Sequence, residues 1–244
     1  MLKVMMDHGA KTLGDPTQGH CVAIDGRSPK FDGGICTRLD CVPFGIAVNK
    51  NGDRFYNEGE DIWPKRYAIW GRLVAGQPDQ VANIIIDSKS INLFMPSVFP
   101  PLVSDTIEGL AAQLKLDPEK LKKTVEDFNA ACEPTVNFDS GMPDGNHTKE
   151  GYDPAKTNWA RPIDQPPFYG YMLRPGITFS YLSLALNEEC RVLKEDGSTF
   201  KNIFAAGELT SGNVLGQGYM AGFGMTIGTV FGRKAGKEAA CLAK

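Results

Sequence analysis

Glycine gathers near the end of the chain, in the stretch FAAGELTSGNVLGQGYMAGFGMTIG that runs from Phe204 to Gly228. Glycine lets the backbone approach a ligand closely and adopt angles that other residues avoid. The stretch leads into a helical pattern, and the first turn of a helix offers unpaired N–H groups to an electron-rich ligand. We therefore interpret residues 204–228 as part of a cofactor-binding site.

Length and composition are those of an ordinary globular protein. The chain has 244 residues, of which 42% are hydrophobic and 23% charged, enough for one large domain or two unequal ones. Its net charge of −3 provides no basic stripe, so nucleic acid is not an expected partner. No apolar run has the length of a membrane span, and the N-terminus lacks a signal-peptide pattern, so no direct membrane insertion is expected.

The six cysteines predict neither a metal site nor a disulfide framework. None lies in a C-x-x-C pair, and the spacing of Cys36 and Cys41 fits no common zinc site. We expect reduced, mostly buried thiols, no metal and a cytoplasmic protein.

The elements that must position the site mix helices and strands. The sequence predicts the end of a helix at 1–9, a hairpin at 45–58 that turns at Asn51–Gly52, a helix from Pro64 to Gly76, a strand at 82–88, helices at 105–116 and 117–132, an irregular stretch at 133–168, strands at 181–206 that turn at Asp196–Gly197, and a helix at 222–240.

Two helix starts carry explicit signals. Asp105 is the predicted N-cap of the first, with Glu108 three residues later as in a capping box. Asp117 is the predicted N-cap of the second, with Pro118 at the first helical position.

Two motifs together resemble the fumarate reductase and succinate dehydrogenase flavoprotein family. They are VNKNGDRFYNE and the later FAAGELTSG with GFGMTIGTVFGRKAGKEAA. The family consists of FAD enzymes that move a hydride between flavin and a dicarboxylate. The segments DGGICTRLD, NEGEDIWPKRYAIWGRL and GNVLGQGYMAGFGM resemble one branch, the FAD-dependent tricarballylate dehydrogenases, which oxidise tricarballylate to cis-aconitate.

The resemblance implies an α+β fold that covers only the C-terminal half of a family member. The family begins with a strand and a G-x-G-x-x-G turn that binds the FAD pyrophosphate, and residues 1–60 contain no such turn. The expected domains are the end of a preceding FAD-domain segment at 1–14, a capping domain at 15–178, and the C-terminal strands and helix of the FAD-binding domain at 179–244. Such a truncated chain is expected to be inactive, to hold FAD weakly or not at all, and to self-associate.

The resemblance also assigns cofactor contacts. Gly207 and Glu208 would lie against the flavin, with the carboxylate accepting hydrogen bonds from the FAD sugar chain. Gly207 would leave room for the ligand, Gly218 is a further cofactor-binding candidate, and the amides near Ala221 and Gly222 would face the flavin pyrimidine oxygen. An alternative reading treats Glu208 as a helix cap or a surface turn residue and the later glycines as sites of close helix–strand packing.

His20, Thr37 and Arg66 match substrate-binding and catalytic residues of the family. His20 and Thr37 would bind substrate carboxylates, and Arg66 would hold the substrate and exchange its proton. Arginine is almost always protonated, so it would act as a base only transiently or would stabilise developing negative charge. Each also has a structural reading: a packed histidine, an ordinary strand threonine and a solvated arginine on a helix. Arg54 and Glu58 are read as a structural ion pair.

The sequence departs from the dicarboxylate enzymes at several site positions. Arg38 replaces the proton-relay acid of the family, and Tyr219 stands near the place of a carboxylate-clamping arginine. Arg38 is therefore a candidate clamp for an extra carboxylate, and Tyr219 a candidate hydrogen-bond donor. Phe179 stands near a family histidine and, with Tyr219, also suits an apolar pocket as in ketosteroid dehydrogenases.

Three functional readings follow. The first is a tricarballylate dehydrogenase that passes electrons to a partner protein or another acceptor. The second keeps FAD but acts as a fumarate reductase, a succinate dehydrogenase or a ketosteroid dehydrogenase. The third is a folded, non-catalytic module that would purify without colour.

Overall fold

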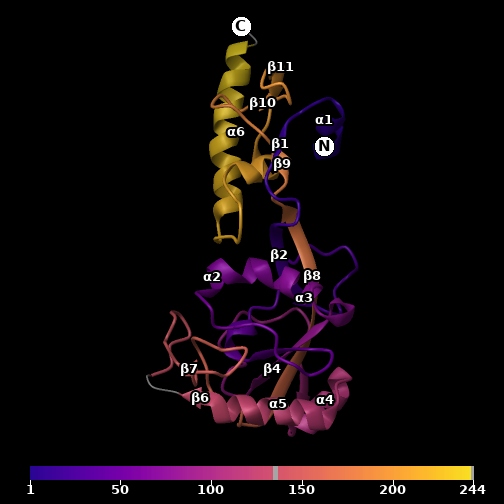
Figure 1. Cartoon of the computed structure of the whole chain (residues 1–244), viewed down its shortest axis with the longest axis vertical. Helices are drawn as coiled ribbons and strands as arrows, with labels where there is room; N and C mark the ends of the chain where they lie inside the picture. Colours follow the sequence, from indigo (N-terminus) through magenta and orange to yellow (C-terminus); the bar gives the residue numbers. More distant parts are fainter. Residues whose placement is uncertain (134–136, 243–244) are drawn as a thin grey trace. The chain divides into compact units, whose positions relative to one another are not determined.

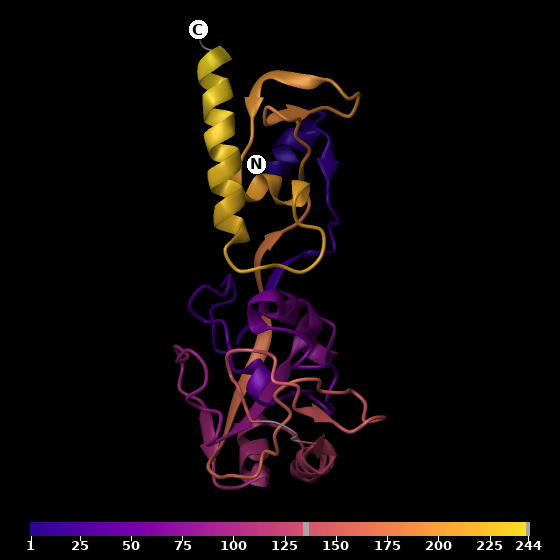
Figure 2. The same cartoon turned by 90° about the vertical axis from the view of Figure 1, so that its left-hand side faces the viewer.

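The computed structural model describes residues 1–133 and 137–242, and the chain separates into two compact units. Unit 1 comprises Met1–His20 and Thr178–Lys244, and unit 2 comprises Cys21–Ile177. Figures 1 and 2 show that both units contain helices and strands, as the predicted fold class requires.

A five-stranded sheet forms the centre of unit 2, in the order β2-β8-β4-β3 with β5 also paired to β8. Its strands are β2 (Gly19–Asp25), β3 (Ile46–Asn49), β4 (Ala82–Asp87), β5 (Leu102–Ser104) and β8 (Phe168–Ser180). The pairings of β4 with β3 and β8, and of β5 with β8, are antiparallel. The predicted strand at 82–88 is therefore confirmed, and it lies inside the sheet.

Helices cover both faces of this sheet, with α2 and α3 on one side of β4 and α4 and α5 on the other (Figure 1). They are α2 (Trp63–Arg66), α3 (Trp70–Ala75), α4 (Ile107–Leu114) and α5 (Pro118–Ala131), with short 3-10 helices at η1 (Val42–Phe44), η2 (Tyr67–Ile69) and η3 (Pro78–Gln80). Ile84 packs in the cluster of Trp70, whereas Ile85 packs in the cluster of Leu110. Because successive strand residues face opposite sides and both sides are covered, the consecutive residues Ile84, Ile85 and Ile86 of β4 are all buried and apolar.

The helix predicted from Pro64 to Gly76 is broken into α2, η2 and α3. Helical structure does end at Ala75, with Gly76 as the C-cap. The break makes Arg66 the last residue of a four-residue helix.

The two helix starts of unit 2 give different outcomes. Asp117 accepts a hydrogen bond from the Lys120 amide at 2.9 Å, which confirms the predicted N-cap of α5. The predicted N-cap Asp105 of α4 is wrong by one residue, because Thr106 is the extended residue and its hydroxyl oxygen accepts from the Gly109 amide at 3.0 Å. Glu108 instead pairs with a lysine of α5.

The hairpin and the irregular stretch are confirmed in part. Gly52 turns the chain with φ +81°, but the returning arm forms only one bridge, between Val48 and Arg54, instead of a second strand. Two short paired strands, β6 (Cys132–Glu133) and β7 (His147–Thr148), lie in or beside the irregular stretch 133–168, of which residues 134–136 lie outside the described residues.

Arg54 and Glu58 form the predicted ion pair, and it is buried. Their side chains are 2% and 0% exposed, and Nη2 lies 2.5 Å from Oε2. Glu58 Oε1 also accepts from the Ala47 amide at 2.8 Å, and Arg54 Nη1 donates to the carbonyl of Pro154 at 2.6 Å. The pair thus joins the hairpin to the irregular stretch in the interior of unit 2.

Lys156 is a second buried charge in unit 2, and it predicts a pH-dependent stability. Its ammonium donates to the carbonyls of Pro43 and Gly45, and burial lowers its pKa from 10.5 to about 8. Between these two values the unfolded chain holds a proton that the folded chain has released, so the contribution of Lys156 to stability rises with pH through this window. We expect the stability of the wild type relative to Lys156→Met to increase by about 3 kcal/mol from pH 7.5 to 10.5, measured by urea unfolding. A difference that does not change with pH would contradict this.

Unit 1 combines two small antiparallel strand pairs with a long helix. Its elements are α1 (Leu2–Asp7), β1 (Thr12–Leu13) paired with β9 (Ser183–Leu184), β10 (Arg191–Leu193) paired with β11 (Thr199–Phe204), the 3-10 helix η4 (Gly207–Asn213) and α6 (Phe223–Leu242). The predicted helix near the N-terminus, the turn at Gly197 with φ +84° and the last helix are confirmed.

Gly212 of η4 packs directly against the backbone of unit 1. A Cβ at this position would lie 2.3 Å from the carbonyl oxygen of Tyr181. We expect Gly212→Ala to lower the free energy of unfolding by about 1–3 kcal/mol through overpacking. Gly236→Ala on α6 is the matched control, because nothing lies within 4 Å of its Cβ position and alanine should stabilise the helix by about 0.5–1 kcal/mol. Equal effects of the two substitutions in thermal unfolding would refute this.

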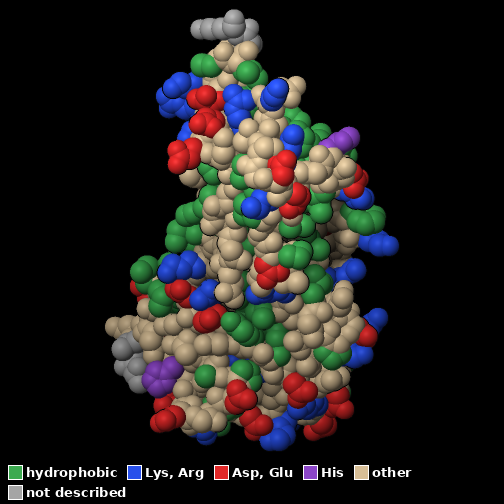
Figure 3. Space-filling view, turned by 45° about the horizontal axis from the view of Figure 1, so that its top comes forward, with side chains coloured by type: hydrophobic (Ala, Val, Ile, Leu, Met, Phe, Trp, Pro, Cys, Tyr) green, Lys and Arg blue, Asp and Glu red, His purple; other side chains and the backbone are tan. Residues whose placement is uncertain are grey.

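The surface carries mixed charge. Acidic and basic side chains are interspersed on the face that Figure 3 shows, without a continuous basic stripe. Among the described residues, no helix combines the length and the apolar character needed to cross a bilayer.

Candidate active site

The AAGE motif and the start of α6 line one pocket of about 200 Å³ in unit 1. Its lining residues are Phe179, Gly207, Glu208, Ser211, Gly224 and Ile227. Gly207 has φ +76°, and a Cβ there would meet no atom within 4 Å, so its backbone is open to a ligand. Glu208 is exposed beside it. The tertiary structure therefore places Gly207 and Glu208 of the AAGE motif and Gly224 at the start of α6 on the same pocket.

The loop before α6 does not line this pocket, but two of its glycines have open space beside the backbone. Gly218 and Gly222 have φ values of +71° and +94°, and a Cβ at either position would meet nothing within 4 Å. Within the described residues, the amides of Ala221 and Gly222 donate no hydrogen bond. These positions fit an extended ligand that needs N–H donors and close backbone approach.

Tyr219 caps the first turn of α6. Its phenolic oxygen accepts a hydrogen bond from the Gly224 amide at 2.7 Å, and the Thr226 amide donates to the carbonyl of Gly222 at 3.1 Å. The Gly224 and Thr226 amides are thus used by the protein itself, whereas those of Ala221 and Gly222 donate to no described residue.

His20 lies in an aromatic cluster of unit 1. Its ring stacks on Phe179 at 5.3 Å and meets the edge of Tyr219 at 4.3 Å, and the residue is 7% exposed. The cluster is apolar except for the polar atoms of His20 and Tyr219, and Phe179 also lines the pocket described above.

Thr37 is a buried residue of unit 2 that already has a hydrogen-bond partner. Its hydroxyl donates to Asp32 Oδ1 at 2.9 Å, and its carbonyl accepts from the Asp25 amide at 3.0 Å. A substrate carboxylate would therefore have to compete with Asp32 for the hydroxyl hydrogen.

Arg38 is held by Asp40 in a bidentate pair. Nε and Nη2 donate to the two carboxylate oxygens at 2.6 and 2.8 Å, and the guanidinium stacks 4.5 Å from the ring centre of Tyr67. The hydrogen bond to Asp40 raises the pKa of Arg38, and Trp63 Nε1 donates to the same carboxylate at 2.8 Å. Because the Arg38–Asp40 pair carries no net charge, Arg38 is a weaker anion-binding group than its residue type suggests.

Arg66 is also ion-paired, but without a hydrogen bond to its acid. Its Nε lies 3.1 Å from Glu60 Oε2, yet this buried atom makes no hydrogen bond, and the guanidinium donates none to any other described residue. Glu60 Oε2 instead accepts from the hydroxyl of Tyr56 at 2.7 Å. The Arg66 guanidinium therefore has Glu60 as a counter-charge but donates no hydrogen bond to it.

The predicted site residues fall into two groups. Thr37, Arg38 and Arg66 belong to unit 2, and Arg38 contacts Tyr67, which directly follows Arg66. His20, Tyr219 and the cofactor candidates belong to unit 1.

Sequence reasoning missed the acids that contact the two arginines. Asp40 and Glu60 each lie within six residues of the arginine they contact. The short separation of Asp40 from Arg38 was the only sequence signal for their ion pair. It is a weak signal, because packing sets the direction of side chains in a loop.

The comparisons with known proteins first define the fold. A solved flavocytochrome c3 fumarate reductase in its open conformation matches 99% of this chain with a TM-score of 0.69, at 23% identity and over 40% of its own length. The two units therefore have the fold of part of a flavoprotein of the fumarate reductase type.

The family follows from the sequence match. Residues 10–224 match the family described as FAD binding domain, and the chain belongs to this family. A digoxin reductase of Eggerthella lenta is 32% identical over 140 residues, which cover 57% of this chain and 22% of the relative. A urocanate reductase of the same organism is 29% identical over 210 residues, which cover 81% of this chain and 31% of the relative. The chain thus spans less than a third of the length of either relative.

Proposed function

We propose that the chain forms the substrate-covering part and a cofactor-contacting part of an FAD-dependent oxidoreductase that acts on a carbon–carbon bond beside a carboxylate. Residues 15–178 would serve as the capping domain, and residues 1–14 and 179–244 would belong to the FAD-binding domain. Membership of the FAD binding domain family supports the cofactor. When bound, FAD supplies hydride transfer to and from carbon.

The residues around the unit 1 pocket would hold the cofactor. Glu208 would accept hydrogen bonds from the FAD sugar chain, while Gly207 and Gly218 leave the backbone open to close contact. The amides of Ala221 and Gly222 would donate to the flavin ring. We expect Glu208→Ala to raise the Kd for FAD about tenfold or more in the flavin-loaded protein, because a charge-assisted hydrogen bond is lost.

Glu195→Ala is the matched control for the cofactor test, since this exposed glutamate lies on the turn after β10 and does not line the pocket. Flavin fluorescence quenching measures both affinities. Equal retention of FAD by the two variants would remove Glu208 from the site, and a colourless wild type that binds no added FAD would support the non-catalytic module.

The guanidinium of Arg66 carries the substrate proposal. In unit 2 it is ion-paired with Glu60 at 3.1 Å but makes no hydrogen bond to a described residue, and a guanidinium is well suited to bind a carboxylate. In the proposed enzyme Arg66 would bind the substrate carboxylate and stabilise the negative charge that develops when the neighbouring carbon loses or gains a proton. Thr37 of the same unit would contribute a further polar contact.

Tricarballylate, oxidised to cis-aconitate, is the specific substrate that the motifs favour. Its third carboxylate would meet Arg38 only by displacing Asp40 from a bidentate pair. The Arg38–Asp40 pair therefore favours a substrate with fewer carboxylates, and succinate with fumarate is the second candidate. The electrons would pass to an acceptor that binds elsewhere on the enzyme.

A panel of substrates tests this proposal. With the flavin-loaded enzyme we expect turnover of tricarballylate or of the succinate–fumarate pair, and none of a 3-oxosteroid. The aromatic cluster of His20, Phe179 and Tyr219 is the one observation that favours an apolar substrate. Turnover of the steroid without turnover of any carboxylate would replace our proposal with the steroid dehydrogenase reading.

A further inference from the structure

Unit 2 contains a second pocket, which none of Thr37, Arg38 and Arg66 lines. It measures about 130 Å³ and is bordered by Gly170 and Met172 on one edge of β8. Gly170 pairs with Leu102 of β5, and the carbonyl of Met172 accepts from the amide of Gly26 after β2 at 2.8 Å. The pocket therefore lies in the gap that β5 and the turn after β2 leave along this edge.

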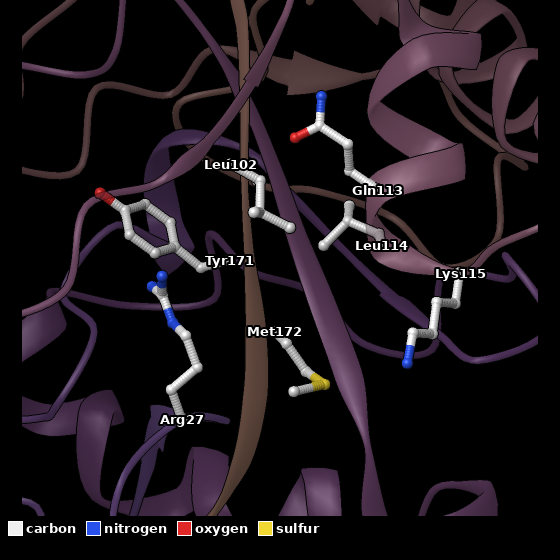
Figure 4. A pocket seen from close by; sticks show the side chains of 8 residues that line it. Arg27, Leu102, Gln113, Leu114, Lys115, Tyr171 and Met172 are labelled. Atoms are coloured by element: carbon white, nitrogen blue, oxygen red, sulfur yellow. The ribbon is translucent and has the colours of Figure 1, made fainter.

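The interior of this pocket is apolar. Leu102, Leu114 and Met172 converge on it, and the ring of Tyr171 borders it (Figure 4). The Tyr171 hydroxyl accepts from Ser97 at 3.0 Å, so the polar end of this side chain is paired away from the apolar wall. A pocket of about 130 Å³ suits a short hydrocarbon chain.

The rim of the pocket carries one uncompensated positive charge. Arg27 donates from Nε and Nη2 to both oxygens of Asp25, at 2.8 and 2.6 Å, so this pair has no net charge. Lys115 lies at the other side of the pocket, is exposed, and forms no ion pair with any described residue. Figure 4 shows Arg27 and Lys115 on opposite sides of Met172.

We propose that this pocket binds a small monocarboxylate with an unbranched apolar chain of about five or six carbons. The chain would replace water against Leu102, Leu114 and Met172, and the carboxylate would remain at the rim beside Lys115. The site belongs to unit 2 alone, and the inference stands whether or not the proposed function holds.

The backbone of Lys115 provides a clean variant for the test. Lys115 is the C-cap of α4 and has φ +59°, a left-handed conformation that glycine adopts without strain. Lys115→Gly removes the charge while it should preserve or increase stability, so a loss of binding in this variant cannot be attributed to misfolding. Lys149→Gln, at an exposed lysine outside the pocket, is the matched control.

The experiment is a titration of the ¹⁵N-labelled chain with acetate, butanoate, hexanoate and 1-hexanol, followed by amide chemical shifts. We expect shifts centred on Leu114, Lys115 and Met172, and a Kd that tightens by about fourfold per added methylene. Hexanoate should bind about three- to fivefold more tightly than 1-hexanol, and Lys115→Gly should remove this advantage while Lys149→Gln keeps it.

Three results would overturn the inference. The first is an affinity that does not depend on chain length, which would show that the apolar wall is not used. The second is equal affinity for hexanoate and 1-hexanol, or an unchanged advantage in Lys115→Gly, which would remove the role of the charge. The third is a set of shifts at amides away from this edge of β8.

Discussion

Replacing Arg66 with glutamine should lower kcat/KM of the flavin-loaded enzyme by about 10²–10³ for a carboxylate substrate, because it removes the cation that stabilises charge on the reacting carboxylate. The same substitution should change the free energy of unfolding by less than about 1 kcal/mol. Within the part of the chain that the structure describes, the guanidinium makes no hydrogen bond, and its ion pair with Glu60 is partly exposed. Steady-state kinetics and urea unfolding of one variant measure both quantities.

Arg38→Gln is the matched control, and it should lower the stability more and kcat/KM less than the Arg66 variant does. Its bidentate pair with Asp40 is lost, so stability should fall by about 1–2 kcal/mol, while kcat/KM falls less than in the Arg66 variant. A larger catalytic loss in the Arg38 variant would exchange the roles of the two arginines. Full activity of the Arg66 variant would remove the carboxylate proposal.

Glu58→Ala should produce the largest loss of stability in unit 2, about 3–5 kcal/mol in the free energy of unfolding. The substitution leaves the buried guanidinium of Arg54 without its counter-charge and removes the acceptor of the Ala47 amide. Denaturant unfolding followed by circular dichroism is the measurement.

Two further variants separate the buried charge from the loss of side-chain volume. Asp127→Ala breaks an exposed pair with Lys123 on α5 and should cost less than about 1 kcal/mol. Replacing Arg54 and Glu58 together with Met and Leu should recover much of the loss, because the remaining buried charge is removed. A double variant as unstable as Glu58→Ala would show that the cost lies in packing.

Local patterns predicted much of the secondary structure. The helix starting after Asp117, the strand at 82–88 and the turns at Gly52 and Gly197 follow from signals within a few residues. The error at Asp105 has the same origin, since neighbouring cap residues compete and the backbone angle at Thr106 decides between them.

The sequence predicted which residues form the candidate site, but it did not predict their ion pairs and hydrogen bonds. The sequence alone does not distinguish Arg38 from Arg66. In the structure Arg38 is hydrogen-bonded to Asp40, whereas Arg66 has a buried Nε that makes no hydrogen bond to a described residue. A sequence pattern does not predict which acid pairs with which arginine. That pairing depends on the loop conformation and on contacts with the rings of Trp63 and Tyr67.

The sequence by itself determined the family, the positions of the glycines and the elements whose signals are local. Glycine-dependent backbone angles, helix caps and alternating apolar residues are determined within a few residues, so they can be predicted from the sequence. Only the tertiary structure decided that Gly207 and Gly224 share a pocket, that Arg54 and Glu58 are buried, and that Lys115 stands beside an apolar gap. Those outcomes depend on contacts between residues far apart in the chain, and burial then sets how strongly each charge acts.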